Sequence, residues 1–533
     1  MNRKRRRSNG NEDVPLPKRT RTISPNDRLS RLSSELLIRI FHHLPIHTLL
    51  QCQTISHRLY TLTSDSQIWK SLYYSRFVLP RALRIPGIKN APPENEGALQ
   101  FSSRRSKWLE DDTLINRKDG RKTDWKKQYR LRHNWSIGAC EVQEIRVREQ
   151  RREKGMLVKL AEGCVVTVDK EEGLRAWDLR KRSLIASCVL DNSSAPTCVA
   201  VDDIGMNRLG IAVGFEDGSW GTWRLDTEIQ SFEREYLHPR SSNGLLSAIA
   251  YAQPYVLTIT DAQLLSLYTF TPDPAKQDPR LLASLKSHTC WPPLSLSIRL
   301  MPSTIIASIA YSLPTFVSGY TVGIQELHLS PVTGTITSSR LTSALPQGFS
   351  SISVSSSPSS GASSPLPSYR SPNGLSGNTI TPPTSLSYAH PYILATHPDN
   401  TLSLYLCTST ASALSLSQGT KLWGHTSSVS SAEITARGKA VSVSTRGNEL
   451  RVWSLEGSFS TSRPTRKAKE QLRDRSVQIR HPPLQLSSLV KDANWNYEDI
   501  TACKHWVGFD DEVVIVLKEE AGGTQALVVY DFT

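Results

Sequence analysis

Between residues 32 and 72, hydrophobic side chains recur every three or four positions, which is the spacing of one face of an α-helix. The first run comprises Leu32, Leu36, Leu37, Ile40, Phe41 and Leu44, the second Leu49, Leu50, Ile55, Leu59 and Leu62, and the third Ile68, Trp69 and Leu72. Pro45 separates the first two runs, because proline lacks an N–H group and can end one helix and begin the next. We therefore expect three short helices. So small a unit buries little apolar surface, and we expect a partner or the rest of the chain to complete it.

From about residue 139 the pattern changes to short apolar runs with turn residues between them, which predicts β-strands. Similar strand endings recur at intervals of 45 to 78 residues, at Trp177, Trp223, Tyr268, Leu327, Tyr405, Trp453 and Tyr530. One ending in each four-stranded sheet predicts seven sheets, with insertions in the longer intervals. Cys140–Val147 alternates in polarity and is the candidate for a closing strand that pairs into the last sheet and removes the exposed edge.

The order of residues in the helical segment resembles the F-box motif, at Glu35–Leu37, Ile40–Phe41, Leu44–Pro45, Leu49–Leu50 and Ile68–Trp69. The resemblance implies docking on the small Skp-type adaptor of a cullin-RING ubiquitin ligase. The residues that would form the docking surface are Leu32, Leu36, Ile40, Leu44, Pro45 and Leu49. Ser33 and Leu59 depart from the family, which usually has Pro and Trp there. Periodicity alone leaves open an ordinary small helical domain.

The segments Trp423–His425 and Leu450–Ser454 resemble the two ends of a WD repeat, which is one blade of a β-propeller. The resemblance implies that the family's His-Ser-Asp-Trp hydrogen-bond set is incomplete here, because Gly447 stands where the Asp is expected. Trp125–Gly138 resembles the helical linker that joins the two modules in F-box/WD-repeat proteins. Basic residues between aromatic ones in this segment could instead indicate single-stranded nucleic acid, which we consider the weaker interpretation.

The expected fold class is therefore multidomain, a small all-α F-box domain followed by an all-β seven-bladed WD-repeat-type propeller. The expected segments are a disordered basic tail at 1–28, the F-box helices at 29–78, a partly helical linker at 79–138, and the propeller at 139–533 with disordered insertions at 346–386 and 457–482. The insertions are inferred from composition, since Ser-, Pro- and Gly-rich or strongly basic segments bury too little apolar surface to offset ordering entropy.

The net charge of +15 is concentrated rather than spread over the chain. Residues 1–31, 104–132 and 463–480 together carry more positive charge than the whole chain, so the remainder is slightly acidic and a basic propeller groove is not indicated. The runs Lys4–Arg7 and Lys18–Arg21 are typical of a two-part nuclear import signal, although a merely solvated basic tail remains the alternative. We expect a nuclear protein, also present in the cytoplasm, with direct binding to nucleic acid disfavoured.

Motifs with catalytic or metal-binding spacing are not found. Eight cysteines are scattered without a C-x-x-C pair, and the pair His43 and His47 is interrupted by Pro45. Nucleotide-binding, hydrolase and zinc-protease motifs are also missing. No apolar run reaches the length of a membrane span. We therefore expect no cofactor, no metal site, no catalytic activity of the chain's own and no membrane partner.

These features favour the substrate-recognition subunit of an SCF-type ubiquitin ligase, whose propeller binds a protein client. In related receptors arginines bind phosphorylated peptides, and the resemblance places Arg446 and Lys170 at such positions, with Glu216 and Asp261 at the same place in the second and third repeats. A nuclear propeller scaffold for protein complexes or chromatin, without a ligase role, is the alternative. The identity of the client, its phosphorylation and the oligomeric state are not determined by the sequence.

Overall fold

The computed structural model contains two compact units, one helical and one built of β-sheets, which divide within helix α8 after Tyr129. It describes residues 29, 32–79, 124–148, 156–161, 163–190, 194–205, 208–270, 278–286, 290–301, 304–315, 319–331, 333–344, 382–410, 413–444, 449–455, 476–479, 503–519 and 525–533. The predicted basic tail and nearly all of the first predicted insertion lie outside these residues. Within the described residues, no helix is both long and apolar enough to cross a membrane.

The helical unit begins with four short α-helices. They are α1 (Ser34–Phe41), α2 (Ile46–Ile55), α3 (His57–Thr63) and α4 (Ser66–Tyr73), followed by a π-helical turn, η2 (Tyr74–Val78), and the first turns of α8 (Trp125–Ile137). The second predicted helix is divided in two at Ser56. This residue is extended, with φ of −156°, and its hydroxyl accepts a hydrogen bond from Leu59 N and so caps α3. The prediction of a single second helix was therefore wrong, because the spacing of apolar residues does not reveal a serine that ends one helix and caps the next.

The helices of this unit pack around Leu37, Phe41, Leu49 and Ile68, which come from α1, α2 and α4. All four side chains are at most 4% exposed. They belong to the three predicted apolar runs, so the helical spacing in the sequence identifies the residues that meet in the core. A second cluster joins α4 to the start of α8 through Trp69, Tyr73, Trp125 and Tyr129.

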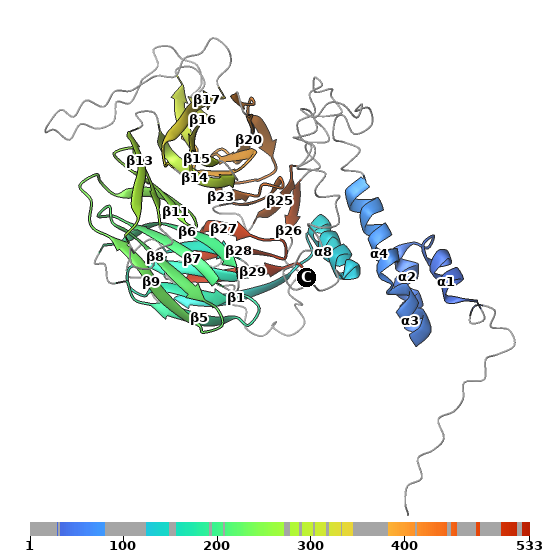
Figure 1. Ribbon diagram of the computed structural model, residues 1–533. Helices are drawn as coiled ribbons and strands as arrows, with labels where there is room; N and C mark the ends of the chain where they lie inside the picture. The colour runs from blue at the N-terminus through green and yellow to red at the C-terminus, as the bar shows by residue number, and fades with distance from the viewer. Residues whose placement is uncertain are drawn as a thin grey trace, which may run out of the picture. The chain divides into compact units, whose positions relative to one another are not determined.

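The larger unit consists of seven antiparallel sheets, which Figure 1 shows in green to red. The first four sheets comprise β2 (Leu157–Ala161), β3 (Cys164–Asp169), β4 (Gly173–Asp178) and β5 (Ser183–Cys188); β6 (Pro196–Gly205), β7 (Arg208–Phe215), β8 (Trp220–Asp226) and β9 (Ser231–His238); β10 (Leu246–Ala252), β11 (Tyr255–Thr260), β12 (Leu264–Thr269) and β13 (Arg280–Lys286); and β14 (Trp291–Met301), β15 (Thr304–Thr315), β16 (Gly319–Leu329) and β17 (Ile336–Ser343). We call these sheets blades one to four.

The remaining sheets are blades five to seven. They comprise β18 (Ser385–Ala389), β19 (Tyr392–Thr396), β20 (Thr401–Ser409), β21 (Leu414–Leu416) and β22 (Thr420–Trp423); β23 (Val429–Ile434), β24 (Lys439–Ser444), β25 (Leu450–Ser454) and β26 (Ser476–Ile479); and β27 (Cys503–Phe509), β28 (Val513–Glu519), β29 (Gln525–Asp531) and β1 (Glu141–Arg148). The strand β26 lies inside the insertion predicted at 457–482. The predicted insertion therefore includes residues that belong to a blade. Four residues of it complete a blade by pairing with β25.

The seven sheets form a closed ring. The first strands of successive blades contact one another, and β27 contacts β2. The strand β1 pairs antiparallel with β29, with Val142 opposite Tyr530, so the first strand of the unit is the outermost strand of its last blade. The sheet prediction is confirmed, because each of the seven predicted strand endings lies on the third strand of a blade. In blade seven this third strand is β29, which pairs with β1.

Neighbouring blades are also joined by hydrogen bonds near the ring's axis. A side chain on the first strand of one blade accepts a backbone N–H of the next blade, from Gln253 to Asp202 at 2.9 Å and from Ile434 to Ser387 at 3.2 Å. The same contact runs from Tyr388 N to Ser295 at 3.1 Å. Each bond satisfies a backbone N–H group that faces the preceding blade rather than its own sheet.

Candidate functional site

Helix α1 presents two different apolar faces. Leu37 and Phe41 are buried in the core, whereas Leu36 and Ile40, one position before each, are 50% and 43% exposed. Ser33, which replaces the family's usual Pro, caps the helix, since its hydroxyl accepts from Leu36 N at 3.4 Å. The helix therefore begins correctly and holds its exposed pair four residues apart on one side.

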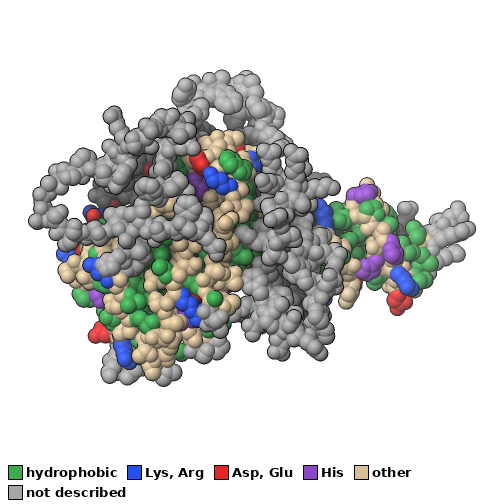
Figure 2. All heavy atoms as spheres, turned by 90° about the horizontal axis from the view of Figure 1, so that it is seen from above, with side chains coloured by type: hydrophobic (Ala, Val, Ile, Leu, Met, Phe, Trp, Pro, Cys, Tyr) green, Lys and Arg blue, Asp and Glu red, His purple; other side chains and the backbone are tan. Residues whose placement is uncertain are grey.

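Exposed apolar side chains are also found on α2 and α3. Leu50, Ile55 and Tyr60 are 44%, 64% and 50% exposed. Figure 2 shows hydrophobic side chains, in green, beside histidines over the helical unit. We call Leu36, Ile40, Leu50, Ile55 and Tyr60 the apolar surface of the helical unit. Three of them were absent from the predicted docking set, although all belong to the apolar runs or directly follow them.

The predicted docking residues differ in accessibility. Leu36, Ile40 and Pro45 are exposed, Leu32 and Leu44 are half-buried, and Leu49 is fully buried. Leu49 therefore supports the surface from the core rather than forming part of it. Arg58, which the sequence did not single out, donates from Nη2 to the carbonyl of Leu32 at 2.7 Å and so ties α3 to the segment before α1.

The aromatic residues of the linker segment are core residues. Trp125 and Tyr129 are 5% and 4% exposed, and they pack edge-on against Tyr73 and Trp69, with ring centroids 5.5 and 5.6 Å apart. Buried rings cannot stack on bases, so these two rings do not support the interpretation of this segment as a nucleic-acid-binding site. Lys126, between them, donates to Gln53 in α2 at 2.9 Å.

The end of α8 is fixed within the propeller unit. Trp135 stacks on Phe532, with centroids 3.9 Å apart and planes at 11°, and its Nε1 donates to Asp511 O at 2.9 Å. Lys439 Nζ lies 2.9 Å from the centroid of the same ring, and burial lowers the pKa of this lysine well below its usual value. Asn134 donates to Phe532 O at 2.8 Å, so both residues of the Asn-Trp pair hold the helix against the C-terminal strand.

Blade six contains a hydrogen-bond set that the sequence described as incomplete. His425 Nε2 lies 2.6 Å from Ser442 Oγ, which also accepts from Trp453 Nε1 at 2.8 Å. The carboxylate comes from Glu449, whose Oε2 lies 3.5 Å from His425 Nδ1, and not from position 447. The prediction of a missing acid was wrong because a longer side chain two residues later reaches the same place. Burial lowers the pKa of His425 to about 4, so this histidine is neutral at physiological pH.

The turns between the second and third strands of the blades form the surface on which the sequence placed phosphate-binding cations. Lys170 is exposed in the first of these turns, next to the exposed Glu171 and Glu172. Glu216 and Asp261 are exposed in the corresponding turns of blades two and three. Arg446 lies outside the described residues, so its position relative to Lys170 stays a prediction.

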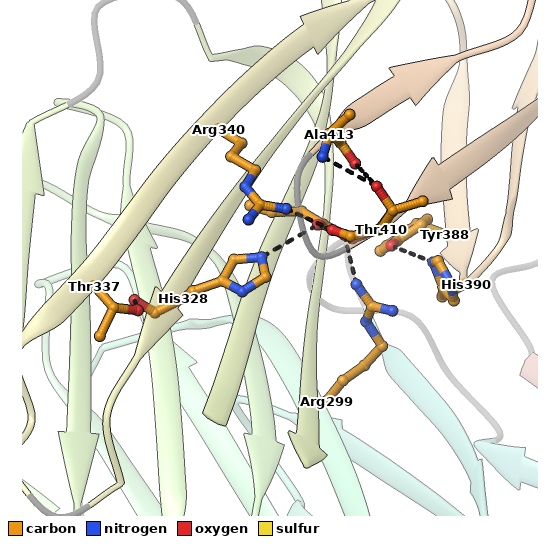
Figure 3. Close-up of polar contacts among 10 residues, drawn as sticks. Arg299, His328, Thr337, Arg340, Tyr388, His390, Thr410 and Ala413 are labelled. Atoms are coloured by element: carbon orange, nitrogen blue, oxygen red, sulfur yellow. Dashed lines mark hydrogen bonds and ion pairs between the residues drawn. The ribbon is translucent and has the colours of Figure 1, made fainter. Parts of the chain in front are cut away.

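A buried polar cluster lies between blades four and five (Figure 3). Glu326 on β16 is fully buried, and its two carboxylate oxygens contact Arg299 Nη2 at 2.5 Å and Ser409 Oγ at 2.6 Å. His328 Nε2 lies 3.6 Å from Glu326 Oε2, and burial, together with Arg340, lowers the pKa of this histidine. Nothing in the sequence pattern indicated this cluster, since its members come from separate strands.

With this geometry established, comparison with known families gives a clear assignment. The F-box protein pof12 beta-propeller family matches residues 140–533, and an F-box-like domain matches residues 30–75. The class of protein defined by the fold is thus an F-box protein with a seven-bladed β-propeller. The chain belongs to the F-box protein pof12 beta-propeller family.

Individual relatives are more distant. The F-box protein dre-1 of Caenorhabditis elegans is 38% identical over 47 residues, which are 9% of this chain and 5% of that protein. Among solved structures, the Cps50 (Swd1) propeller domain of Myceliophteria thermophila aligns over 74% of this chain and 100% of that chain, with 10% identity and a TM-score of 0.41. BamB from Moraxella catarrhalis aligns over 74% and 98%, with 10% identity and a TM-score of 0.39.

Proposed function

We propose that this chain is the substrate-recognition subunit of an SCF-type ubiquitin ligase, in which the helical unit binds the Skp-type adaptor and the propeller binds a protein client. An F-box domain implies a Skp1-type adaptor as partner, and the domain precedes a propeller here. The observation that carries the proposal is the exposure of Leu36 and Ile40, 50% and 43%, on a helix whose remaining core-spaced residues are buried. Contact of these side chains with water is unfavourable, and a partner would remove it.

In this proposal the chain itself performs no covalent chemistry. The conjugating enzyme bound to the RING subunit transfers ubiquitin, and the receptor raises the effective concentration of a client lysine near it. Strongly shifted pKa values do occur in the propeller, but packing accounts for them. Burial between strands raises the pKa of Tyr251 and of Tyr530, and neither shift requires a catalytic role.

The client-binding surface is proposed to be the face that carries the turns between second and third strands. The described turns of blades one to three present more carboxylates than cations there, with Lys170 flanked by Glu171 and Glu172. Recognition of a phosphorylated client would therefore depend on Arg446, whose planar guanidinium suits phosphate. We propose a nuclear location on the basis of the basic runs Lys4–Arg7 and Lys18–Arg21.

The test is co-elution of the purified full-length chain with the Skp-type adaptor. The double variant Leu36→Asp, Ile40→Asp places two charges on the apolar surface while leaving the core residues intact. Because truncation or charging of a central interface residue costs about 2 kcal/mol or more, we expect the affinity to fall by roughly 30-fold or more.

Leu184→Asp is the matched control, since Leu184 is 45% exposed but lies on the propeller. It should bind the adaptor as well as the original chain does. Equal binding by the double variant would refute the docking surface, whereas no binding by the original chain would favour the scaffold function. Stabilisation of a propeller-bound client by proteasome inhibition separates a ligase from a scaffold.

A further inference from the structure

Three residues with metal-binding side chains meet between blades four and five, apart from either proposed binding surface. Glu326 lies on β16, His390 follows β18, and Cys407 lies on β20. One ligand atom from each, a carboxylate oxygen, a ring nitrogen and the thiol sulfur, lies within 4.8 Å of the other two. Glu326 and Cys407 are fully buried. The three residues are distant in the sequence, so only the closing of blade five against blade four brings them together.

We propose that Glu326, His390 and Cys407 bind a divalent transition-metal ion, with Zn²⁺ the ion best suited to this combination of ligands. Oxygen, imidazole nitrogen and thiolate sulfur are the three ligand types that Zn²⁺ takes in proteins, whereas Ca²⁺ and Mg²⁺ prefer oxygen alone. The site would hold blades four and five together. Zinc sites with three protein ligands retain a fourth position for water or another side chain.

Neighbouring groups already orient the three ligands. Arg299 holds one oxygen of Glu326 and Ser409 donates to the other, which fixes the carboxylate plane. The hydroxyl of Tyr388 lies 3.4 Å from His390 Nδ1 and also hydrogen-bonds Cys407. Figure 3 shows His328 and Arg340 on one side of the cluster and Tyr388 and His390 on the other. Partners of this kind around metal ligands set the ring orientation and the affinity.

His328 lies beside the cluster, against the carboxylate of Glu326. Its Nε2 lies 3.6 Å from Glu326 Oε2. This atom is buried and has no hydrogen-bond partner among the residues that the structure describes.

The charges of the cluster suit the site both before and after an ion binds. Before binding, Arg299 neutralises the carboxylate of Glu326. On binding, the sulfur–hydrogen bond breaks, its electron pair forms the bond to the ion, and the proton passes to solvent. The thiolate and carboxylate then offset the two positive charges, while Arg299 keeps its contact with the carboxylate. A buried ion pair without any metal function is the competing interpretation.

The experiment uses tag-free, full-length protein that has been stripped with a chelator and returned to metal-free buffer. Co²⁺ serves as the probe, because its bond to a thiolate produces a charge-transfer absorption that nitrogen and oxygen ligands do not. We expect one equivalent of Co²⁺ to produce this band and Zn²⁺ to displace it. Cys407→Ser should abolish the band. His390→Gln should weaken Co²⁺ binding by more than the roughly 10–100-fold typical of changes to groups that only hydrogen-bond a metal ligand.

Cys290→Ser is the matched control, since Cys290 is 1% exposed and belongs to the core of blades three and four. It should retain the band. Urea unfolding in the presence of chelator establishes whether each variant folds as the original chain does, and Zn²⁺ should raise the urea midpoint of the original chain and of Cys290→Ser only. Absence of the band in the original chain, or its persistence in Cys407→Ser, would overturn the proposal, as would undiminished binding by His390→Gln.

Discussion

Replacing Trp135 with Ala should destabilise the propeller unit more than any exposed substitution of the same kind. The ring is 5% exposed, stacks on Phe532 and donates a hydrogen bond to Asp511 O. Removing about 200 Å² of buried aromatic surface at about 25 cal/mol per Å² costs about 5 kcal/mol. Measured losses for Trp to Ala in protein cores are about 3–5 kcal/mol, since the site relaxes in part.

The assay is urea unfolding of the full-length chain, followed by the fluorescence of the remaining tryptophans. With a denaturant slope of about 3 kcal/mol/M, the expected loss lowers the urea midpoint by roughly 1 M or more. Trp135→Phe keeps the stack and loses the hydrogen bond to Asp511, so it should cost about 1 kcal/mol. The two variants together separate stacking from hydrogen bonding.

Trp423→Ala is the control, because Trp423 is 58% exposed on β22. A substitution at such a position changes stability by about 0.5 kcal/mol or less. If Trp135→Ala and Trp423→Ala unfold at the same midpoint, then the stacked ring does not hold α8 to the propeller and the reasoning from burial fails.

Two further predictions concern local features of the same unit. The pKa of His425 is lowered to about 4 from an ordinary 6.5. Its neutral form therefore contributes up to roughly 3 kcal/mol of stability above pH 6.5, and this contribution is lost as the pH falls toward 4. His425→Gln should therefore show a smaller decrease in urea midpoint between pH 7 and pH 5 than the original chain, and an equal decrease would contradict the assignment. Gly138→Ala should lower the urea midpoint of the protein more than Gly163→Ala does. Both glycines have a positive φ, so both substitutions strain the backbone. Only at Gly138 would the new Cβ also lie 2.7 Å from a backbone oxygen, that of Gln478. Equal losses would mean that backbone conformation alone determines the cost.

The candidate sites were predictable to different degrees. Leu36 and Ile40 follow from the residue order that resembles the F-box motif, and both are exposed as a docking surface requires. Leu49 belonged to the same predicted set but is fully buried, because two adjacent apolar residues on a short helix can exchange roles and spacing alone does not say which one faces the core. Glu449 was missed because it approaches His425 from a position two residues after the one where the resemblance places the acid.

The sequence by itself determined the two modules and the number of blades. Helical spacing, strand endings and the closing strand are local or repeated patterns, and each is imposed by the need to bury one face of an element. The segment Trp125–Gly138, which resembles a helical linker, does form a helix at Trp125–Ile137, and its rings Trp125, Tyr129 and Trp135 are buried.

Only the tertiary structure decided which side chains from separate blades meet. The contact of Glu326 with Ser409, and its approach to Cys407 and His390, join strands of blades four and five that follow no common spacing. The ring must close before these groups approach, since each lies on a face that is exposed in an isolated sheet. Polar groups buried by that closure need partners, and the partners are set by the register of one blade against the next.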